Sequence, residues 1–355
     1  MSSSPLPRHH RLTRAAALTA AALVTGAVLT ACGGGDDTAD ENAGAPAGPT
    51  IVASTTVYAD IAEQVAGGNA TVESVISDAA ADPHSYEASP ADAAAVTDAD
   101  LVVYNGAGYD SFVDRALGNA ADVPVVRAVD EYARVTGETI AEHSHGEESE
   151  EHGDDHDDEH GEVHDDEAHG HDSETNEHVW FSLPTAAAVA ERVAEELAEI
   201  DEANAEEYRD NARRFADGLT PLEEQIDEIH DRGHFPYAQT ERIGAHLFDA
   251  AHMVDLTPSG FLASVEDDTD PSAADLSATL DLIDESRVAF LAFNTQTETA
   301  VTARVREAAE SADVAVVDLA ETLPEDADYT SWMTDIVDSL SSALQGATPV
   351  SDGGH

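Results

Sequence analysis

Residues 51–68 read IVASTTVYADIAEQVAGG, and the fold class follows from their pattern. The apolar run 51–55 predicts a buried strand, and residues 57–66 repeat apolar side chains at helical spacing before the stop signal Gly67-Gly68. Further strands are predicted at 72–76, 101–104 and 123–126, with helices at 90–98 and 111–117. This alternation of strand and helix predicts an α/β layer with a mostly parallel sheet.

The same alternation returns in the second half of the chain. A helix is predicted from Pro184, at its preferred first position, to about residue 200. A longer helical pattern runs from about 201 to 230, and Pro221 is expected to kink or break it. Strands follow near 235–240, 288–293 and 314–318, with helices near 242–252, 273–284 and 298–312.

We therefore predict two lobes, each with a mostly parallel sheet flanked by helices, joined by a long rigid linker helix. The N-terminal lobe spans residues 50–200, the linker helix 201–232 and the C-terminal lobe 233–349.

The composition excludes several classes of function. The chain has 355 residues with 15 Lys+Arg, all of them arginine, against 74 Asp+Glu, a formal net charge of −59. So acidic a protein repels a phosphate backbone, which rules out nucleic-acid binding. The single cysteine, Cys32, cannot form an intramolecular disulfide or a thiolate metal site. Any metal must therefore be held by His, Asp, Glu or water.

The N-terminus has the pattern of an export signal. Arg8, Arg11 and Arg14 precede an apolar stretch, 15–28, that is too short to span a bilayer comfortably. The residues Leu-Thr-Ala-Cys at 29–32 resemble a bacterial lipobox, in which a peptidase cuts before the cysteine and its thiol is lipidated. We expect 1–31 to be a lipoprotein signal peptide, Cys32 the lipidation site and 32–49 a flexible tether, which places the protein outside the cytoplasm on a lipid anchor.

A segment of quite different composition interrupts the N-terminal lobe. Residues 141–177 hold 17 Asp or Glu and eight His, with almost nothing apolar, so we predict a disordered loop. Its histidines are candidates for a low-affinity metal-collecting loop, and the alternative is a solvated, charge-extended linker. They are His143, His145, His152, His156, His160, His164, His169 and His171.

Histidines and acids also follow the predicted strands, where a parallel sheet presents its ligand-binding loops. His84 follows a proline that fixes its backbone, and His178 stands where the chain re-enters the fold. Glu241, Asp318 and Glu321 come after strands of the second lobe. Each residue alone also fits an ordinary role, as a loop histidine, a helix N-terminal carboxylate or a solvated acid.

Taken in order, the motifs resemble the cluster A-I solute-binding proteins, bacterial lipoproteins that serve ABC importers for zinc and manganese. The motifs are the opening strand and helix 51–58, DPHSYE at 82–87, YNGAGY at 104–109 and HVWF at 178–181. The resemblance spans nearly the whole mature chain. It implies two parallel-sheet lobes joined by a rigid helix, one divalent cation between them, and an ABC-transporter permease as partner of a monomeric receptor.

Carried over residue by residue, the resemblance gives the ligands of that cation. His84 and His178 are the first two, and Glu241 takes the third position, where the family has His or Glu after a strand-end Ser or Thr. The fourth ligand is usually Asp in the family, and this sequence departs from the usual motif. We predict Glu321 there, with Asp318 as the alternative.

Two further histidines lie close to the third ligand in the sequence. His246 stands five residues after Glu241, where the family more often has an aromatic residue, and His252 follows on the same predicted helix. We interpret both as structural, with ligation by one of them as the alternative.

The cargo is predicted to be Zn²⁺, with Mn²⁺ as the alternative. A His-rich loop ahead of the second ligand motif resembles the zinc-dedicated members, and imidazole prefers zinc to manganese. Carboxylates in the third and fourth positions resemble the manganese members, because hard oxygen ligands suit that ion. We give the loop more weight, since eight histidines are of little use for capturing manganese.

Two other classes of function compete with a transport receptor. A zinc hydrolase needs a metal-bound water and a general base, and the chain has neither an HExxH helix nor a nucleophile elbow, so we predict that it is not an enzyme. A surface metal buffer or adhesin would depend on the His-rich loop itself.

Overall fold

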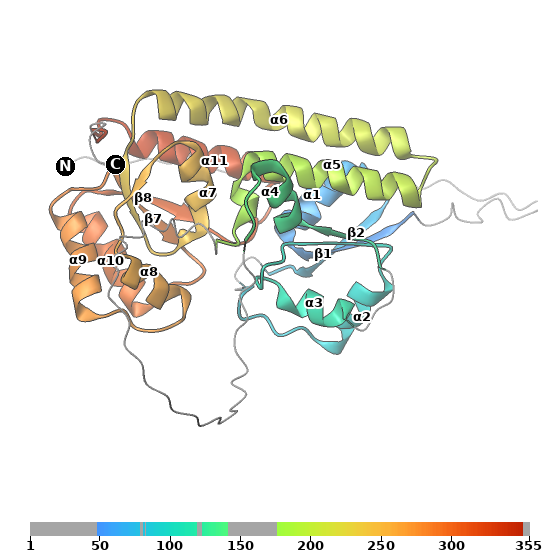
Figure 1. Cartoon of the computed structure of the whole chain (residues 1–355), viewed down its shortest axis with the longest axis horizontal. Coiled ribbons are helices and arrows are strands. Elements are labelled where there is room, and N and C mark those ends of the chain that lie inside the picture. The colour runs from blue at the N-terminus through green and yellow to red at the C-terminus, as the bar shows by residue number, and fades with distance from the viewer. Residues whose placement is uncertain (1–47, 79–80, 82, 119–122, 141–175, 351–355) are drawn as a thin grey trace, which may run out of the picture. The chain divides into compact units, whose positions relative to one another are not determined.

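A computed structural model of the chain describes residues 48–78, 81, 83–118, 123–140 and 176–350 (Figure 1). The predicted signal peptide, Cys32 and the eight loop histidines lie outside these ranges. Among the residues described, no helix combines the length and the hydropathy that a membrane span requires.

The first half of the fold is a four-stranded parallel sheet in the order β2-β1-β3-β4. Its strands are β1 (Thr50–Thr55), β2 (Thr71–Ile76), β3 (Leu101–Tyr104) and β4 (Val125–Arg127). Its helices are α1 (Thr56–Ala66), α2 (Pro90–Asp98), α3 (Ser111–Leu117) and α4 (Ala128–Thr136). Gly67 ends α1 in the left-handed conformation at φ 59°, as the glycine pair predicts.

Alternate residues of these strands pack on opposite faces of the sheet, because successive side chains of a strand point to opposite sides. Val52 and Val102 join the cluster formed with α2 and α3. Ile51, Ala53 and Val103 join the larger cluster formed with α1 and α5 (Leu183–Ile200). The sheet is therefore covered on both faces, as is usual for a parallel sheet.

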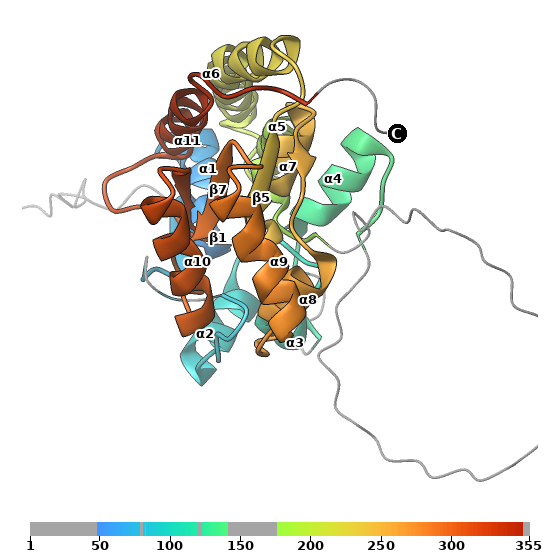
Figure 2. The same ribbon diagram turned by 90° about the vertical axis from the view of Figure 1, so that its left-hand side faces the viewer.

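The second half repeats this topology, with the strand order β6-β5-β7-β8, again all parallel. Its strands are β5 (Pro236–Gln239), β6 (Val254–Asp255), β7 (Phe290–Asn294) and β8 (Ala315–Leu319). The helices α8 (Ser259–Glu266), α9 (Ala273–Asp284) and α10 (Ala300–Ser311) lie side by side on one face (Figure 2). The other face packs against α7 (Ala245–Ala250) and α11 (Tyr329–Ala343).

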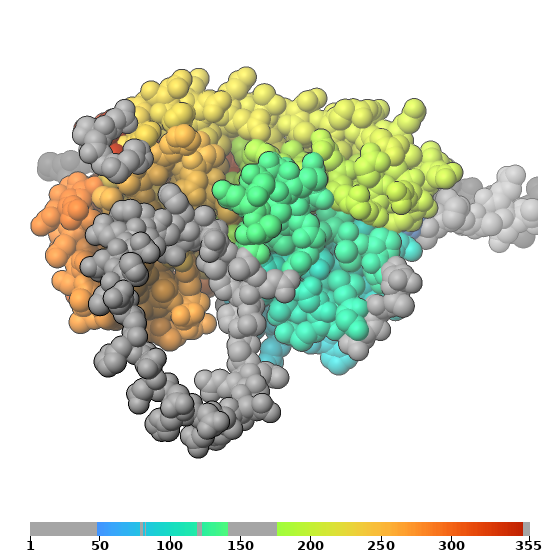
Figure 3. Space-filling model, viewed as in Figure 1, coloured from blue at the N-terminus to red at the C-terminus, as the bar shows by residue number. Residues whose placement is uncertain are grey.

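A long helix, α6 (Ala205–Asp231), runs beside α5 and reaches both halves of the fold (Figures 1 and 3). It packs against α1 of the first half and against α7 and α11 of the second. Of the kink or break predicted at Pro221, the break is wrong, because α6 continues through it. Pro221 and Asp217, whose carbonyl loses its helical partner, are both exposed, so water can satisfy that carbonyl.

Most predicted strands and helices are present, and four elements were not predicted. These are α4, β6, α8 and α11. Helix α11 joins the two halves, since the Tyr329 hydroxyl donates to the Trp180 carbonyl at 2.6 Å and the Tyr329 amide donates to Asp60 at 2.8 Å. The C-terminal helix therefore shares a core with the first half of the chain.

Candidate metal centre

The structure brings together the four residues predicted as ligands. One donor atom each from His84, His178, Glu241 and Glu321 lies within 4.8 Å of the other three. Glu241 and Glu321 each stand two residues after the end of a parallel strand, β5 and β8, and His84 lies in the connection from β2 to α2. His178 immediately precedes the 3₁₀ turn Val179–Phe181.

Asp318, the alternative fourth ligand, does not belong to this group. Its carboxylate pairs with Arg306 at 2.7 Å on the surface, and its side chain is 52% exposed. Side chains alternate along β8, so the neighbours Val317 and Leu319 face the core while Asp318 faces the opposite side of the sheet. Of the two candidates, only Glu321 lies with the other donors in the structure.

Each imidazole nitrogen of the group lies close to both carboxylates. The Nε2 atom of His178 lies 3.7 Å from Glu241 Oε1 and 3.6 Å from Glu321 Oε1. The Nε2 atom of His84 lies 3.9 Å from the same two oxygens. In a tetrahedral zinc site with bonds of about 2.0–2.2 Å, neighbouring donors are about 3.4 Å apart. The four imidazole–carboxylate distances would need to contract by only a few tenths of an ångström to reach that spacing.

Two buried donor atoms support a metal-binding role. His178 is 3% exposed and Glu321 is fully buried, yet among the described residues neither His178 Nε2 nor Glu321 Oε2 has a hydrogen-bond partner. Buried polar atoms without partners are rare in proteins because their desolvation is costly. A cation bound by both atoms would supply the missing interactions.

Asn176 fixes the tautomer of His178. The Nδ1–H of His178 donates to Asn176 Oδ1 at 2.8 Å, which leaves Nε2 as the atom with the lone pair for a metal. The Asn176 amide in turn donates to the Arg242 carbonyl at 3.1 Å. Asn176 and Glu177, which the sequence analysis placed at the end of the loop, thus belong to the described fold around the site.

Replacing Asn176 with alanine is expected to weaken metal binding about 10- to 100-fold, because partners that orient a ligating imidazole typically contribute that much. A metal titration in competition with a chelating dye measures the change. Asn204→Ala, in the turn before α6, is the matched control and should leave the affinity unchanged. Equal affinities of the Asn176→Ala and wild-type proteins would contradict the positioning role.

Asn294, at the end of β7, links the two carboxylates. Its side-chain amide donates to Glu241 Oε2 at 2.6 Å and to Glu321 Oε1 at 2.8 Å. The Thr297 hydroxyl also donates to Glu241 Oε2, at 2.7 Å. Sequence reasoning missed Asn294, although a polar residue directly after the apolar run LAF at a strand end was a usable signal.

The electrostatics of the site favour a cation. Burial alone lowers the pKa of His178 and is the largest single effect, but the charges of Glu321, Glu177 and Glu241 outweigh it and raise that pKa to about 10. Burial opposes ionisation of Glu321, yet His178 and His84 lower its pKa to about 2. Burial, followed by the charge of Glu321, raises the pKa of Glu241. Without metal, His178 carries a proton that offsets the carboxylates.

Aromatic side chains surround the histidines. Tyr109 lies edge-on to His84 with ring centroids 4.9 Å apart, and Trp180 lies edge-on to His178 at 5.2 Å. The two histidines that follow Glu241 in the sequence, His246 and His252, lie outside the four-donor group. His246 Nε2 contacts the Asn176 carbonyl at 3.0 Å, and His252 belongs to a separate cluster.

Comparisons with known proteins identify the family of the chain and its relatives. The family model described as zinc-uptake complex component A, periplasmic, matches residues 51–343. The manganese-binding lipoprotein MntA of Halalkalibacterium halodurans is 27% identical over 57% of this chain and 56% of its own length. The zinc-binding lipoprotein AdcA of Streptococcus pneumoniae is 27% identical over 66% of this chain and 42% of its own. The chain thus spans about half the length of these curated relatives.

A solved structure shares the fold. The periplasmic zinc-binding protein TroA of Treponema pallidum superimposes with a TM-score of 0.63 over 84% of this chain and 99% of its own, at 14% identity. Both halves of the parallel-sheet architecture therefore have a counterpart of known structure.

Proposed function

Because the chain belongs to the family of zinc-uptake complex component A proteins, we propose that it is an extracytoplasmic receptor that binds Zn²⁺ and delivers it to the membrane permease of an ABC importer. The family consists of substrate-binding proteins of metal transporters. The observation that carries the proposal is the group of two imidazoles and two carboxylates, three of them buried, contributed by loops of both parallel sheets.

Zinc is the proposed cargo, with manganese as the alternative. Two imidazoles with two carboxylates at near-tetrahedral spacing suit zinc, which accepts nitrogen and oxygen donors in a four-coordinate shell. Manganese prefers a larger set of hard oxygen ligands. The relatives do not decide between the two metals, because one is named for manganese and another for zinc. The proposal of zinc therefore rests on the chemistry of the four donors and on the eight loop histidines.

The donor set favours binding over catalysis. Four protein ligands fill a tetrahedral shell, whereas a catalytic zinc site keeps one position for an activated water. Ion binding between loops of the two halves would stabilise the loaded form by mass action, and that form would dock on the permease. Cys32 is the proposed point of lipid attachment to the outer face of the membrane, and the receptor is proposed to act as a monomer.

A competitive titration of zinc against manganese tests the cargo. We expect one tight site that prefers zinc, both in the wild-type chain and in a variant whose eight loop histidines are replaced by glutamine. The variant should lose only weaker binding, because the loop is proposed to raise the local ion concentration without forming the main site.

Each other outcome identifies an alternative. Preference for manganese would make the protein a manganese receptor of the same family. Loss of all tight binding in the loop variant would favour the surface buffer or adhesin and contradict the receptor.

A further inference from the structure

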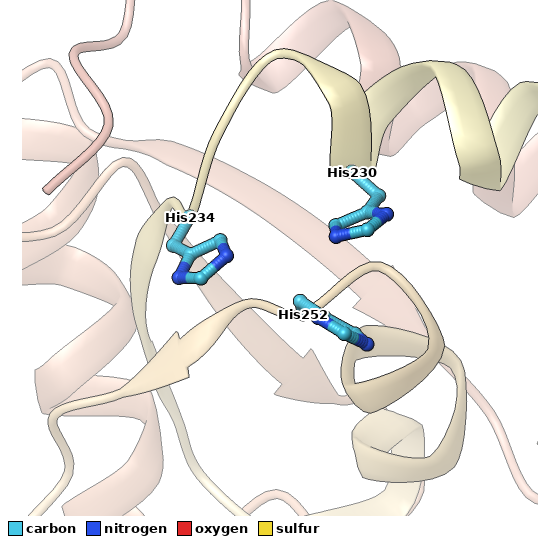
Figure 4. Close-up of side chains that lie close together, drawn as sticks. All are labelled: His230, His234 and His252. Carbon is cyan, nitrogen blue, oxygen red and sulfur yellow. The ribbon is translucent and has the colours of Figure 1, made fainter. Parts of the chain in front are cut away.

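A second group of imidazoles lies at the other end of β5 from the site described above. His230 stands in the last turn of α6, His234 just before β5, and His252 in the turn after α7. Their ring centroids are 4.2 Å apart for His230 and His252, 6.0 Å for His234 and His252, and 6.2 Å for His230 and His234. Figure 4 shows the three rings gathered between these segments, and each offers a ring nitrogen within 4.8 Å of the others.

Backbone contacts hold these segments in place. Gly233, at φ 115°, turns the chain between His230 and His234, a conformation that favours glycine. The carbonyl of Phe235, next to His234, accepts from the Val254 amide at 2.9 Å, which fixes the segment of His252 beside that of His234. His252 itself adopts the left-handed conformation at φ 51°, uncommon for a residue with a side chain. The three imidazoles are thus presented by ordered backbone.

The chemistry of the group specifies the ligand. The three imidazoles form a set of nitrogen donors, which suits zinc, copper and nickel far better than manganese, magnesium or calcium. In a tetrahedral zinc site the nitrogens are about 3.3 Å apart. Because His230 and His234 are partly exposed and His252 is exposed, small side-chain rotations can close the remaining distance.

We propose that His230, His234 and His252 form a second metal site, which binds one zinc-class divalent ion with water completing the shell. The site is separate from the four-donor group, because β5 lies between its histidines and Glu241. With three donors in place of four among the described residues and with greater exposure, it is expected to bind more weakly and to exchange its ion more readily than the four-donor site. It does not depend on the proposed transport function.

A zinc titration of a simplified chain tests the proposal. The protein has 17 histidines, of which six lie in the described ranges, so the other 17 − 6 = 11 can be replaced by glutamine to remove competing sites. Calorimetry of this chain should show a tight first event and a weaker second one. His230→Asn and His252→Asn should each weaken the second event at least tenfold and leave the first unchanged.

The matched control is His246→Asn, since His246 lies against Tyr132, with ring centroids 4.8 Å apart, and outside the three-histidine group. It should retain the second event. As an independent readout, the ring ¹⁵N signals of the three histidines should shift during the second event in the simplified chain. Circular dichroism shows whether each variant is folded.

The outcomes separate this proposal from the proposed function. Absence of a second event in the simplified chain, or its persistence in both the His230→Asn and His252→Asn variants, would overturn the second site. If only the weaker event is seen, and it is weakened in the His230→Asn and His252→Asn variants, the second site is upheld and the result counts against the receptor.

Discussion

Glu321→Gln is expected to weaken zinc binding at least a hundredfold, which corresponds to about 2.7 kcal/mol or more. Glutamine has nearly the volume of glutamate but no charge, so the site loses a fully buried anionic donor that lies 3.6 Å from His178 Nε2. Partners that only orient a ligand contribute about 10- to 100-fold, and a ligand itself should contribute more. Competition with a chelating dye of known affinity measures the loss.

Asp318→Asn is the matched control for that variant. Asp318 lies three residues earlier, is also an acid, and forms an exposed ion pair with Arg306, which is worth less than about 1 kcal/mol. Its replacement should leave zinc affinity within about twofold of the wild-type value, a change of less than about 0.5 kcal/mol. The reverse result, with loss of affinity in Asp318→Asn and not in Glu321→Gln, would show that Asp318 is the fourth ligand.

The apparent affinity for zinc is expected to rise about tenfold for each pH unit between about pH 6 and pH 8. The pKa of His178 is raised to about 10 in the metal-free protein, so its imidazole is protonated throughout this range. An incoming ion must displace that proton, and the deprotonated fraction grows tenfold per pH unit below the pKa. The raised pKa of Glu241 acts in the same direction, whereas Glu321, with a pKa of about 2, stays ionised.

Calorimetry in buffers of different ionisation enthalpy tests the same prediction by counting protons. At least one proton should be released for each zinc ion bound near pH 7. His246→Asn is the control and should release the same number of protons as the wild-type protein. Burial lowers the pKa of His246 to about 4, so its ring is already neutral near pH 7. An affinity that stays flat from pH 6 to pH 8 would mean that His178 is neutral before the ion arrives.

Local sequence pattern determined most of the fold. The strand and helix at 51–66 were predicted nearly to the residue, because a short apolar run followed by helical periodicity and a glycine pair is a purely local signal. Helix α9 was predicted with its observed bounds for the same reason. Local pattern failed at Pro221, because whether a proline interrupts a helix depends on which side of the helix faces water.

For the metal centre, too, local sequence and tertiary structure determined different features. The sequence by itself supplied the candidates, since histidines and acids after strand ends of a parallel sheet meet at its carboxyl edge, and the resemblance to a known family ordered them as ligands. Only the tertiary structure distinguished Glu321 from Asp318, because that choice depends on which side chain reaches donors from distant loops. The same holds for Asn294, whose hydrogen bonds to the two glutamates join residues far apart in the chain, and for Asn176, whose amide reaches the distant Arg242 carbonyl.

The three-histidine cluster is the clearest case of what the sequence could not provide. His230, His234 and His252 belong to the end of a helix, the approach to a strand and a turn, so no single periodicity relates them. The proximity of His234 and His252 follows from parallel pairing between β5 and β6, and β6 is a two-residue strand too short to predict. Local propensity is encoded within a few residues, whereas a binding site requires contacts across the whole chain, and only the packed structure specifies those.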